Sequence, residues 1–275
     1  MEFIEIIKVI FLGIVQGITE WLPVSSTGHM ILVDQFLTFS YSPEFREVFF
    51  VVIQFGSILA VILLFWEKLF PFDVKDGFKV QQDKLLLWLK IGIACVPAAI
   101  IGLLFDDIID ELFFNYQTVA IMLIIYGVLF IIVENVNKNK RSRINNLNQI
   151  TFPLAMMIGI FQMLAIIPGT SRSGATIVGG LMLGMSRYVA SEFTFFLAIP
   201  VMFGASLLKI VRIGLDFTTA EWITMGVGTV TAFLVSILAI KFLLQYIKRN
   251  DFKAFGYYRI ALGIFVLAYF HFLTV

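Results

Sequence analysis

Residues 21–33, WLPVSSTGHMILV, gather polar side chains in the middle of a strongly apolar chain. Ser25, Ser26, Thr27 and His29 fall within five positions, and Glu20 lies just before them. A serine or histidine that a neighbouring base activates can act as a nucleophile, for example on phosphorus. A carboxylate or an imidazole can also move protons as a general acid or base. This stretch therefore has the residue types of a catalytic site.

A second polar stretch, PGTSRSG at residues 168–174, surrounds Arg172, the one charged residue between positions 152 and 186. A charge inside so apolar a segment costs about 2.5–3.5 kcal/mol on insertion scales and needs a partner. The planar guanidinium suits phosphate oxygens, and Glu20 is the alternative partner. An ion pair between Arg172 and Glu20 could also be the resting state of an active site.

Residues with hydroxyl side chains and glycines lie near both Glu20 and Arg172 in the sequence. Each polar stretch is expected to open a half-helix, whose free N–H groups favour an anion, and glycine lets the backbone approach a ligand closely. Helix capping is the alternative role for any single hydroxyl. The candidates for catalysis are Glu20, Ser26, His29 and Arg172. The candidates for substrate binding are Gln16, Ser25, Thr27, Gly169, Thr170, Ser171, Ser173, Gly174 and Thr176.

The composition places these residues in a membrane protein. Of the 275 residues, 60% are hydrophobic and only 14% are charged, whereas soluble domains have about 25% charged residues. With a mean hydropathy of +0.95, the chain is predicted to be an all-α integral membrane protein. The single Cys95 excludes a disulfide framework and a cysteine metal cluster. The net charge of +1 indicates no partner, and we expect no nucleic acid to bind.

Six apolar runs are long enough to cross a bilayer, which needs about 20 residues. They cover roughly residues 47–66, 85–105, 116–133, 193–210, 222–243 and 257–274. Two further segments, 9–38 and 152–186, are apolar at both ends and broken by proline and polar residues in the middle. We expect each to form a re-entrant hairpin whose loop faces a cavity inside a single membrane domain, residues 1–275. One kinked spanning helix is the alternative for each segment.

Basic residues in the loops predict the orientation. The loops at 67–84, 135–150 and 244–256 are basic and the loop at 106–115 is acidic, so the basic loops should lie in the cytoplasm. The halves, roughly 1–134 and 151–275, then run in opposite senses as an inverted repeat, linked by the basic cytoplasmic loop 135–150. QGITEWLPVSSTG (16–28) echoes QMLAIIPGTSRSG (162–174), and Glu47 and Glu192 hold matching positions. Such repeats bring two broken helices together around an anion at the midplane.

The motifs resemble those of the undecaprenyl-diphosphatase family, also called bacitracin-resistance proteins, over essentially the whole chain. The family's (E/Q)-x-x-x-E motif is matched by Gln16 to Glu20, and its P-V-S-S-T-G-H motif by Pro23 to His29. Its P-G-x-S-R-S-x-x-T motif is matched by Pro168 to Thr176. Many members have a glutamate where this chain has Gln16, so Glu20 is the only certain carboxylate of the pair.

This resemblance implies hydrolysis of C55 undecaprenyl diphosphate to the monophosphate and inorganic phosphate. It places the protein in the bacterial plasma membrane with the active site facing outward, and it implies a role in recycling the carrier of peptidoglycan and in bacitracin resistance. It also implies support by a divalent cation, Mg²⁺ or Ca²⁺, which Glu20 could hold through the substrate phosphates although the sequence shows no closed metal cage. A homodimer is one assembly that we expect.

Two other functions fit part of the pattern. A lipid phosphatase of the acid-phosphatase type has similar serine and arginine elements, but Val178 stands where its histidine would be. A polyprenyl-phosphate transporter or flippase would use the same anion site without needing Glu20, Ser26 and His29 together. For an enzyme, the nucleophile stays open between Ser26, which we favour, His29 and a water molecule activated by Glu20.

Overall fold

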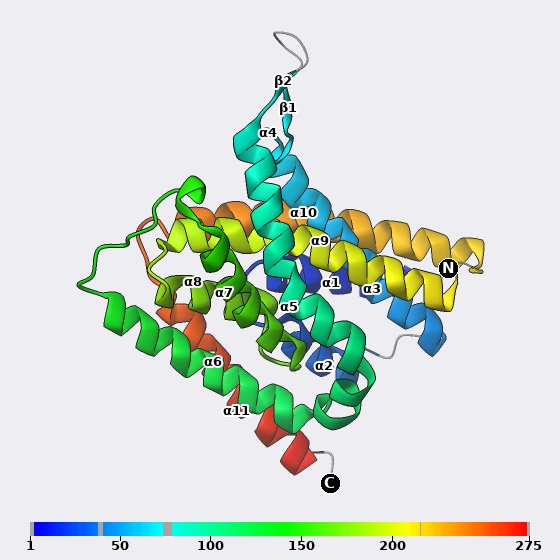
Figure 1. Ribbon diagram of the computed structural model, residues 1–275. Helices are drawn as coiled ribbons and strands as arrows, with labels where there is room; N and C mark the ends of the chain where they lie inside the picture. The colour runs from blue at the N-terminus through cyan, green and yellow to red at the C-terminus, as the bar shows by residue number, and fades with distance from the viewer. Residues whose placement is uncertain (1–2, 38–40, 74–78, 215, 274–275) are drawn as a thin grey trace.

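The computed structural model describes residues 3–37, 41–73, 79–214 and 216–273, and these residues are mostly helical (Figure 1). Six of the described helices are long and apolar enough to cross a membrane, which confirms the six predicted spans. They are α3 (Pro43–Leu64), α5 (Gln82–Phe113), α6 (Tyr116–Asn137), α9 (Arg187–Ile213), α10 (Thr219–Tyr246) and α11 (Lys253–Leu273).

The remaining elements are shorter. The other α-helices are α1 (Phe3–Thr19), α2 (Ser26–Phe36), α4 (Trp66–Leu69), α7 (Phe152–Met163) and α8 (Arg172–Met182), and the 3₁₀ turns are η1 (Leu147–Gln149) and η2 (Leu164–Ile166). Two short antiparallel strands, β1 (Phe72–Asp73) and β2 (Lys79–Val80), form a hairpin, which is a small exception to the all-α prediction.

The expectation of a loop at residues 106–115 was wrong for most of that stretch. α5 continues to Phe113 because no glycine or proline interrupts residues 106–113. The next helix begins where the Asn115 side chain accepts a hydrogen bond from the Thr118 N–H at 2.8 Å. The same kind of N-cap starts several other helices and satisfies one of their free N–H groups. These caps are Ser42, Thr151, Ser186 and Thr218.

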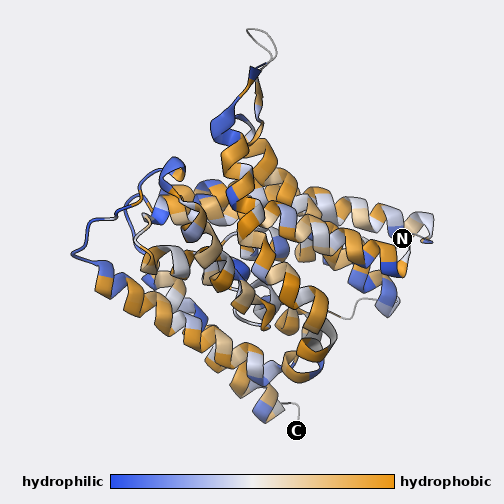
Figure 2. Cartoon of the chain, in the orientation of Figure 1, coloured by the Kyte–Doolittle hydropathy of each residue, from blue (hydrophilic) through white to orange (hydrophobic). Residues whose placement is uncertain are grey.

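Helices from the two halves of the chain pack against one another. α10 packs against α1 and α3, while α5 packs against α7 and α9. α6 and α11 lie side by side, and α3 packs against α9 (Figure 1). Most residues in the long helices are hydrophobic, whereas hydrophilic residues gather in the loop between α6 and α7 and near the β1–β2 hairpin (Figure 2).

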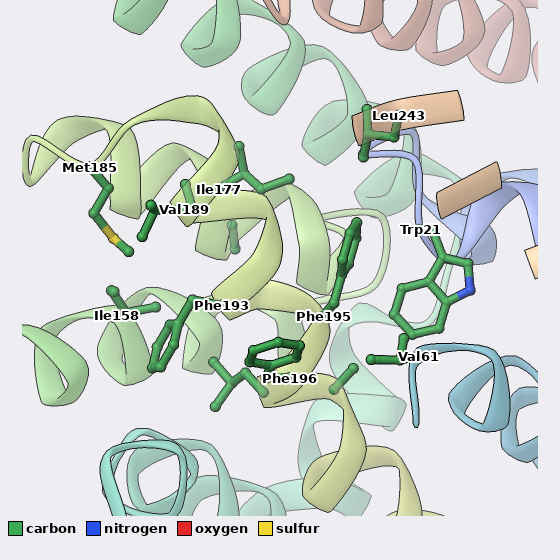
Figure 3. Close-up of a cluster of buried hydrophobic side chains, with 14 of the residues drawn as sticks. Trp21, Val61, Ile158, Ile177, Met185, Val189, Phe193, Phe195, Phe196 and Leu243 are labelled. Atoms are coloured by element: carbon green, nitrogen blue, oxygen red, sulfur yellow. The ribbon is translucent and has the colours of Figure 1, made fainter. Parts of the chain in front are cut away.

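A cluster of aromatic side chains on α9 anchors the segment that follows α1. Phe193, Phe195 and Phe196 are buried, and Trp21 meets Phe195 edge to face with 5.4 Å between the ring centroids (Figure 3). Such a pair contributes about 0.5–1.5 kcal/mol beyond the burial of its area. The indole therefore holds the chain next to Glu20 against the centre of the bundle.

Small residues let α6 and α11 approach closely. A Cβ atom on Gly127 would lie 2.7 Å from the carbonyl oxygen of Gly256, and a Cβ atom on Gly256 would lie 2.7 Å from that of Gly127. Helices in membranes associate through packing of this kind, because lipid provides no hydrophobic driving force between them.

We predict that Gly127→Ala lowers the stability of the folded protein by about 1–3 kcal/mol, the usual effect of overpacking. The matched control is Gly92→Ala in α5, where a Cβ atom would meet nothing within 4 Å. The control should be neutral or slightly stabilising, because alanine favours the helix. Thermal unfolding of the purified proteins in detergent measures both effects. Equal stability of the two variants would contradict the close-packing interpretation.

Candidate active site

Two interruptions in the helices bring the polar stretches together. α1 ends at Thr19 and α2 begins at Ser26, while the segment after α7 passes through the turn η2 before α8 begins at Arg172. Pro23 and Pro168 lie in these breaks and cannot donate a backbone hydrogen bond to continue a helix. The backbone at both breaks is mostly buried.

The residue before each second helix is a serine in the same strained conformation. Ser25 has φ 72° and Ser171 has φ 71°, and they are the two non-glycine residues with positive φ in the described part of the chain. Each side chain accepts a hydrogen bond from the N–H three residues later, that of Gly28 at 3.4 Å and that of Gly174 at 3.2 Å. Such a conformation costs about 1–3 kcal/mol and is concentrated at functional sites. The matching geometry singles out both breaks as functional candidates.

An ion pair joins the two breaks. Arg172 Nη2 donates to Glu20 Oε1 at 2.8 Å, and the two side chains are only 12% and 9% exposed. The guanidinium also donates to the Thr194 carbonyl oxygen at 3.2 Å and lies 5.9 Å from the centre of the Trp21 ring. Arg172 thus has partners for its charge and for part of its fork, as its position in an apolar segment requires.

Glu20 also accepts hydrogen bonds from two polar side chains at the first break. Its Oε2 atom accepts hydrogen bonds from Gln16 Nε2 at 3.1 Å and from Ser26 Oγ at 3.4 Å. Gln16 reaches it from one turn earlier on α1, and Ser26 reaches it from the first residue of α2. Four of the candidates, Gln16, Glu20, Ser26 and Arg172, therefore form one connected network.

His29 faces a different neighbour. Its Nδ1 lies 2.7 Å from the Ser25 carbonyl oxygen and its Nε2 lies 2.7 Å from the Tyr258 hydroxyl, with the two rings stacked. A carbonyl oxygen only accepts, so Nδ1 carries the proton, and Nε2 of a neutral ring accepts from Tyr258. Both ring nitrogens are thereby engaged away from Ser26 and Glu20. The expected contact between His29 and Ser26 is not among the contacts of the described residues.

The other hydroxyl candidates mostly support the second break. Ser173 Oγ lies 3.1 Å from Ser171 Oγ and 3.4 Å from the Glu20 carbonyl oxygen. Thr176 Oγ1 donates to the Arg172 carbonyl oxygen at 2.9 Å, one turn back in α8. Thr170 is fully buried, and its hydroxyl has no hydrogen-bond partner within the described chain. Thr27, which is half-buried, likewise makes no side-chain hydrogen bond to a described residue.

Arg259 on α11 is a residue that the motifs did not single out. It is fully buried and donates to the carbonyl oxygens of Gly169 at 2.9 Å, Thr170 at 2.8 Å and Pro23 at 3.3 Å. It therefore ties the two breaks together through their backbones. The signal that could have found it is the one that found Arg172, a charge within an apolar span. Tyr258, the partner of His29, is its neighbour in sequence.

The electrostatics of this region favour an anion. Arg172 and Arg259 bring two positive charges, while Glu20 brings one negative charge. Gly169 has φ 91°, and a Cβ atom there would lie 2.5 Å from the Val119 carbonyl oxygen, so the chain passes α6 closely at this point. Within the described ranges, no three His, Cys, Asp or Glu side chains are grouped so that they could hold a metal ion. A divalent cation here would use Glu20 Oε2 and ligands from a bound phosphate, a common arrangement for Mg²⁺.

The chain is similar to known proteins over its full length. A protein-family model described as bacitracin resistance protein BacA matches residues 9–265. An undecaprenyl-diphosphatase of Desulfitobacterium hafniense is 62% identical, covering 100% of this chain and 99% of that protein. Proteins of the same name from Acetivibrio thermocellus and Enterococcus faecalis are 60% and 57% identical, each covering 97% of this chain and 98% of that protein. With its six apolar helices, this is a multi-pass membrane protein, and the chain belongs to the bacitracin resistance protein BacA family.

Proposed function

We propose that this protein hydrolyses undecaprenyl diphosphate to undecaprenyl phosphate and inorganic phosphate. The observation that carries the proposal is the buried Glu20–Arg172 ion pair, which joins two helix breaks and also contacts a serine hydroxyl. The relatives named undecaprenyl-diphosphatase also support it, because they align with this chain over essentially its full length. The reaction would return the lipid carrier to peptidoglycan synthesis, and it is consistent with the bacitracin resistance in the family's name.

The diphosphate would bind between the two breaks. α2 and α8 both begin there, and the free N–H groups of a helix N-terminus favour a phosphate. The fork of Arg172 can hold two phosphate oxygens once it releases Glu20. Arg259 would add a positive charge that the ion pair does not neutralise. When a phosphate replaces the Glu20 carboxylate on Arg172, the positive charge of Arg172 would therefore stabilise the bound substrate, and Glu20 would be free to transfer a proton.

Ser26 is the nucleophile that the contacts favour. Its hydroxyl already points to Glu20 Oε2 at 3.4 Å, so Glu20 would take the proton as Ser26 Oγ bonds to the terminal phosphorus. The bond from phosphorus to the bridging oxygen would break, and that oxygen would leave with its electron pair on undecaprenyl phosphate. Glu20 would pass that proton to the leaving oxygen and so become a base again. It would then take a proton from water as the water oxygen attacks the phosphorus, the serine–phosphate bond breaks, inorganic phosphate leaves, and the proton returns to Ser26 Oγ. Direct attack by His29 or by such a water molecule remains the alternative.

We infer a role for His29 that differs from the base expected beside Ser26. Its bonds to the Ser25 carbonyl oxygen and to Tyr258 would hold the strained start of α2 in place. To protonate the leaving oxygen, His29 would first have to release Tyr258 and take up a proton at Nε2. Mg²⁺ or Ca²⁺, if bound through Glu20 and the phosphates, would neutralise charge on the diphosphate.

The re-entrant hairpins and the inverted repeat are part of this proposal. The strained serines at the two breaks, and the packing of α10 on α1 and α3 beside that of α5 on α7 and α9, support the repeat. Reciprocal ion pairs support it further, because Glu47 pairs with Lys209 and Glu192 pairs with Lys68. The first pair joins α3 to α9, and the second joins α4 to α9, so the two glutamates make comparable contacts in the two halves.

The orientation follows from the charges. The loops that carry most of the Lys and Arg residues would lie in the cytoplasm of a bacterial cell. An active site open to the outer face of the plasma membrane is implied by the resemblance to the undecaprenyl-diphosphatases alone. A homodimer stays a prediction. The same repeat could serve a transporter or flippase, but the Ser26–Glu20 contact is what a hydrolase needs and a carrier does not.

Purified protein in detergent should release inorganic phosphate from C55 diphosphate. Activity should rise with Mg²⁺ or Ca²⁺ and fall with EDTA, because a divalent cation would help to neutralise the diphosphate. A colorimetric phosphate assay measures both effects, with Glu20→Gln as the inactive control. Lipid movement across vesicles without phosphate release would favour the flippase instead.

Arg172→Lys should lose most of the activity although the charge is kept, because a lysine cannot form the two parallel hydrogen bonds of the guanidinium fork. The matched control is Arg212→Lys at the exposed end of α9, which should keep its activity. Steady-state phosphate release compares the two. Turnover near that of the wild type in the Arg172 variant would remove the phosphate-clamp role.

Ser26→Ala and His29→Ala separate the possible nucleophiles. Loss of the nucleophile should abolish phosphoenzyme formation, whereas loss of a general acid or base costs about 10²–10⁴ in rate. We expect Ser26→Ala to form no phosphoenzyme and His29→Ala to form it slowly, as followed with substrate labelled in the terminal phosphate. Removing even an auxiliary acid or base usually lowers the rate by about 100-fold or more. If Ser26→Ala kept more than about a tenth of the activity, Ser26 would therefore not be the nucleophile, and His29 or water would attack instead.

A further inference from the structure

A polar cavity lies well away from the candidate active site, at the end of the bundle where α6 ends and α9 begins. Its volume is about 680 Å³, which is within the usual range for pockets that hold small molecules, roughly 300–1,000 Å³. The loop at residues 138–143, the turn at residues 181–188 and Ile247 at the end of α10 line most of it. α8 separates it from Arg172 by its full length, about 15 Å at 1.5 Å per residue.

The walls of this cavity, here called the basic cavity, are fixed to one another. The N–H groups of Arg143 and Ile144 donate to the Gly184 carbonyl oxygen at 2.9 and 3.1 Å, and the Ser186 N–H donates to that of Ile144 at 2.8 Å. Asn137 Nδ2 adds a bond to the Leu181 carbonyl oxygen at 3.0 Å. The loop after α6 is therefore held against the α8–α9 turn as a short ladder.

Positive charge dominates the lining. Five basic side chains face one carboxylate, that of Glu134, which is buried and already accepts from Arg187 and from the Phe252 N–H. The other four basic side chains make no hydrogen bond or ion pair with any described residue. They are Lys138, Lys140, Arg141 and Arg143. The N-terminus of α9, capped by Ser186, also opens on the cavity and favours an anion.

Apolar residues border the basic cavity on the side of the helices. Met182 and Tyr188, which both line the cavity, are 58% and 37% exposed. Exposed apolar side chains on a spanning helix are the ones that meet lipid. A basic cavity next to such a surface lies where the phosphate and the acyl chains of one lipid molecule would be.

We propose that the basic cavity binds the phosphate of an anionic membrane phospholipid, whose acyl chains lie along Met182 and Tyr188. Basic pockets at the ends of membrane helices recognise such head groups through charge and hydrogen bonds. The site would bind lipid whether or not the catalytic site is occupied. A free phosphate offers the same head-group chemistry but leaves the apolar border uncovered.

The test titrates detergent-purified protein with phosphatidylglycerol, phosphatidylcholine or inorganic phosphate and counts bound molecules by native mass spectrometry. Phosphatidylglycerol should bind more tightly than phosphatidylcholine, and millimolar phosphate should not displace it. Arg141→Gln/Arg143→Gln should weaken phosphatidylglycerol binding about 30-fold, the effect of two basic residues near an anionic lipid. The matched control is Lys248→Gln/Arg249→Gln, an exposed basic pair in the neighbouring loop outside the cavity, which should bind as the wild type does.

Photolabelling tests the unmodified protein in case the double variant fails to fold. A photoactivatable phosphatidylglycerol should label residues 138–143 and 181–188 of the wild type rather than residues 248–253. Equal losses in the two double variants, equal binding of phosphatidylcholine, displacement by phosphate, or labelling at 248–253 would each overturn the proposal. Phosphate release from C55 diphosphate by Arg141→Gln/Arg143→Gln should be unchanged in lipid-free detergent, which separates this site from the catalytic one.

Discussion

Breaking two helices inside an apolar bundle leaves backbone carbonyl groups without water to satisfy them, and the arrangement of the site depends on how that need is met. Each unsatisfied group would cost several kcal/mol in such surroundings. Arg259 meets much of it, because one fully buried guanidinium donates to the carbonyl oxygens of Pro23, Gly169 and Thr170. Arg172 adds a bond to the Thr194 carbonyl oxygen. The same two arginines supply the positive charge of the candidate active site, so stability of the breaks and affinity for an anion have a common origin.

Glu20 is the point at which this charge is balanced. Its two oxygens separate two roles, since Oε1 holds Arg172 and Oε2 accepts from Gln16 and Ser26. A phosphate that takes the place of Oε1 on Arg172 would leave the carboxylate next to a hydroxyl and in need of a proton. Buried ion pairs often add little net stability, because desolvation of the charges offsets their attraction. We therefore regard this pair as a closed form of the site, one that substrate can open.

Packing elsewhere in the bundle holds Glu20 and Arg259 in position. Trp21 packs on Phe195 beside Glu20, and Gly127 and Gly256 bring α11, which carries Arg259, close to α6. Strain at Ser25 and Ser171 persists because neighbouring groups fix both loops. At the far end of α8, the basic cavity likewise combines a loop fixed by backbone hydrogen bonds with several basic side chains.

The sequence by itself determined the class of protein, the six spans and the polar breaks at Glu20–Ser26 and Pro168–Arg172, because hydropathy, proline and charge act locally along the chain. It also supplied Glu20 as a partner for Arg172, since a charge in an apolar segment requires one. It missed the continuation of α5 beyond residue 105, where acidic residues suggested a loop but nothing interrupts the helix. Only the tertiary structure decided that His29 faces Tyr258 and that Arg259 clamps both breaks. Those contacts join residues up to 236 positions apart, and no local pattern specifies which distant side chain will fill a given space when the helices pack.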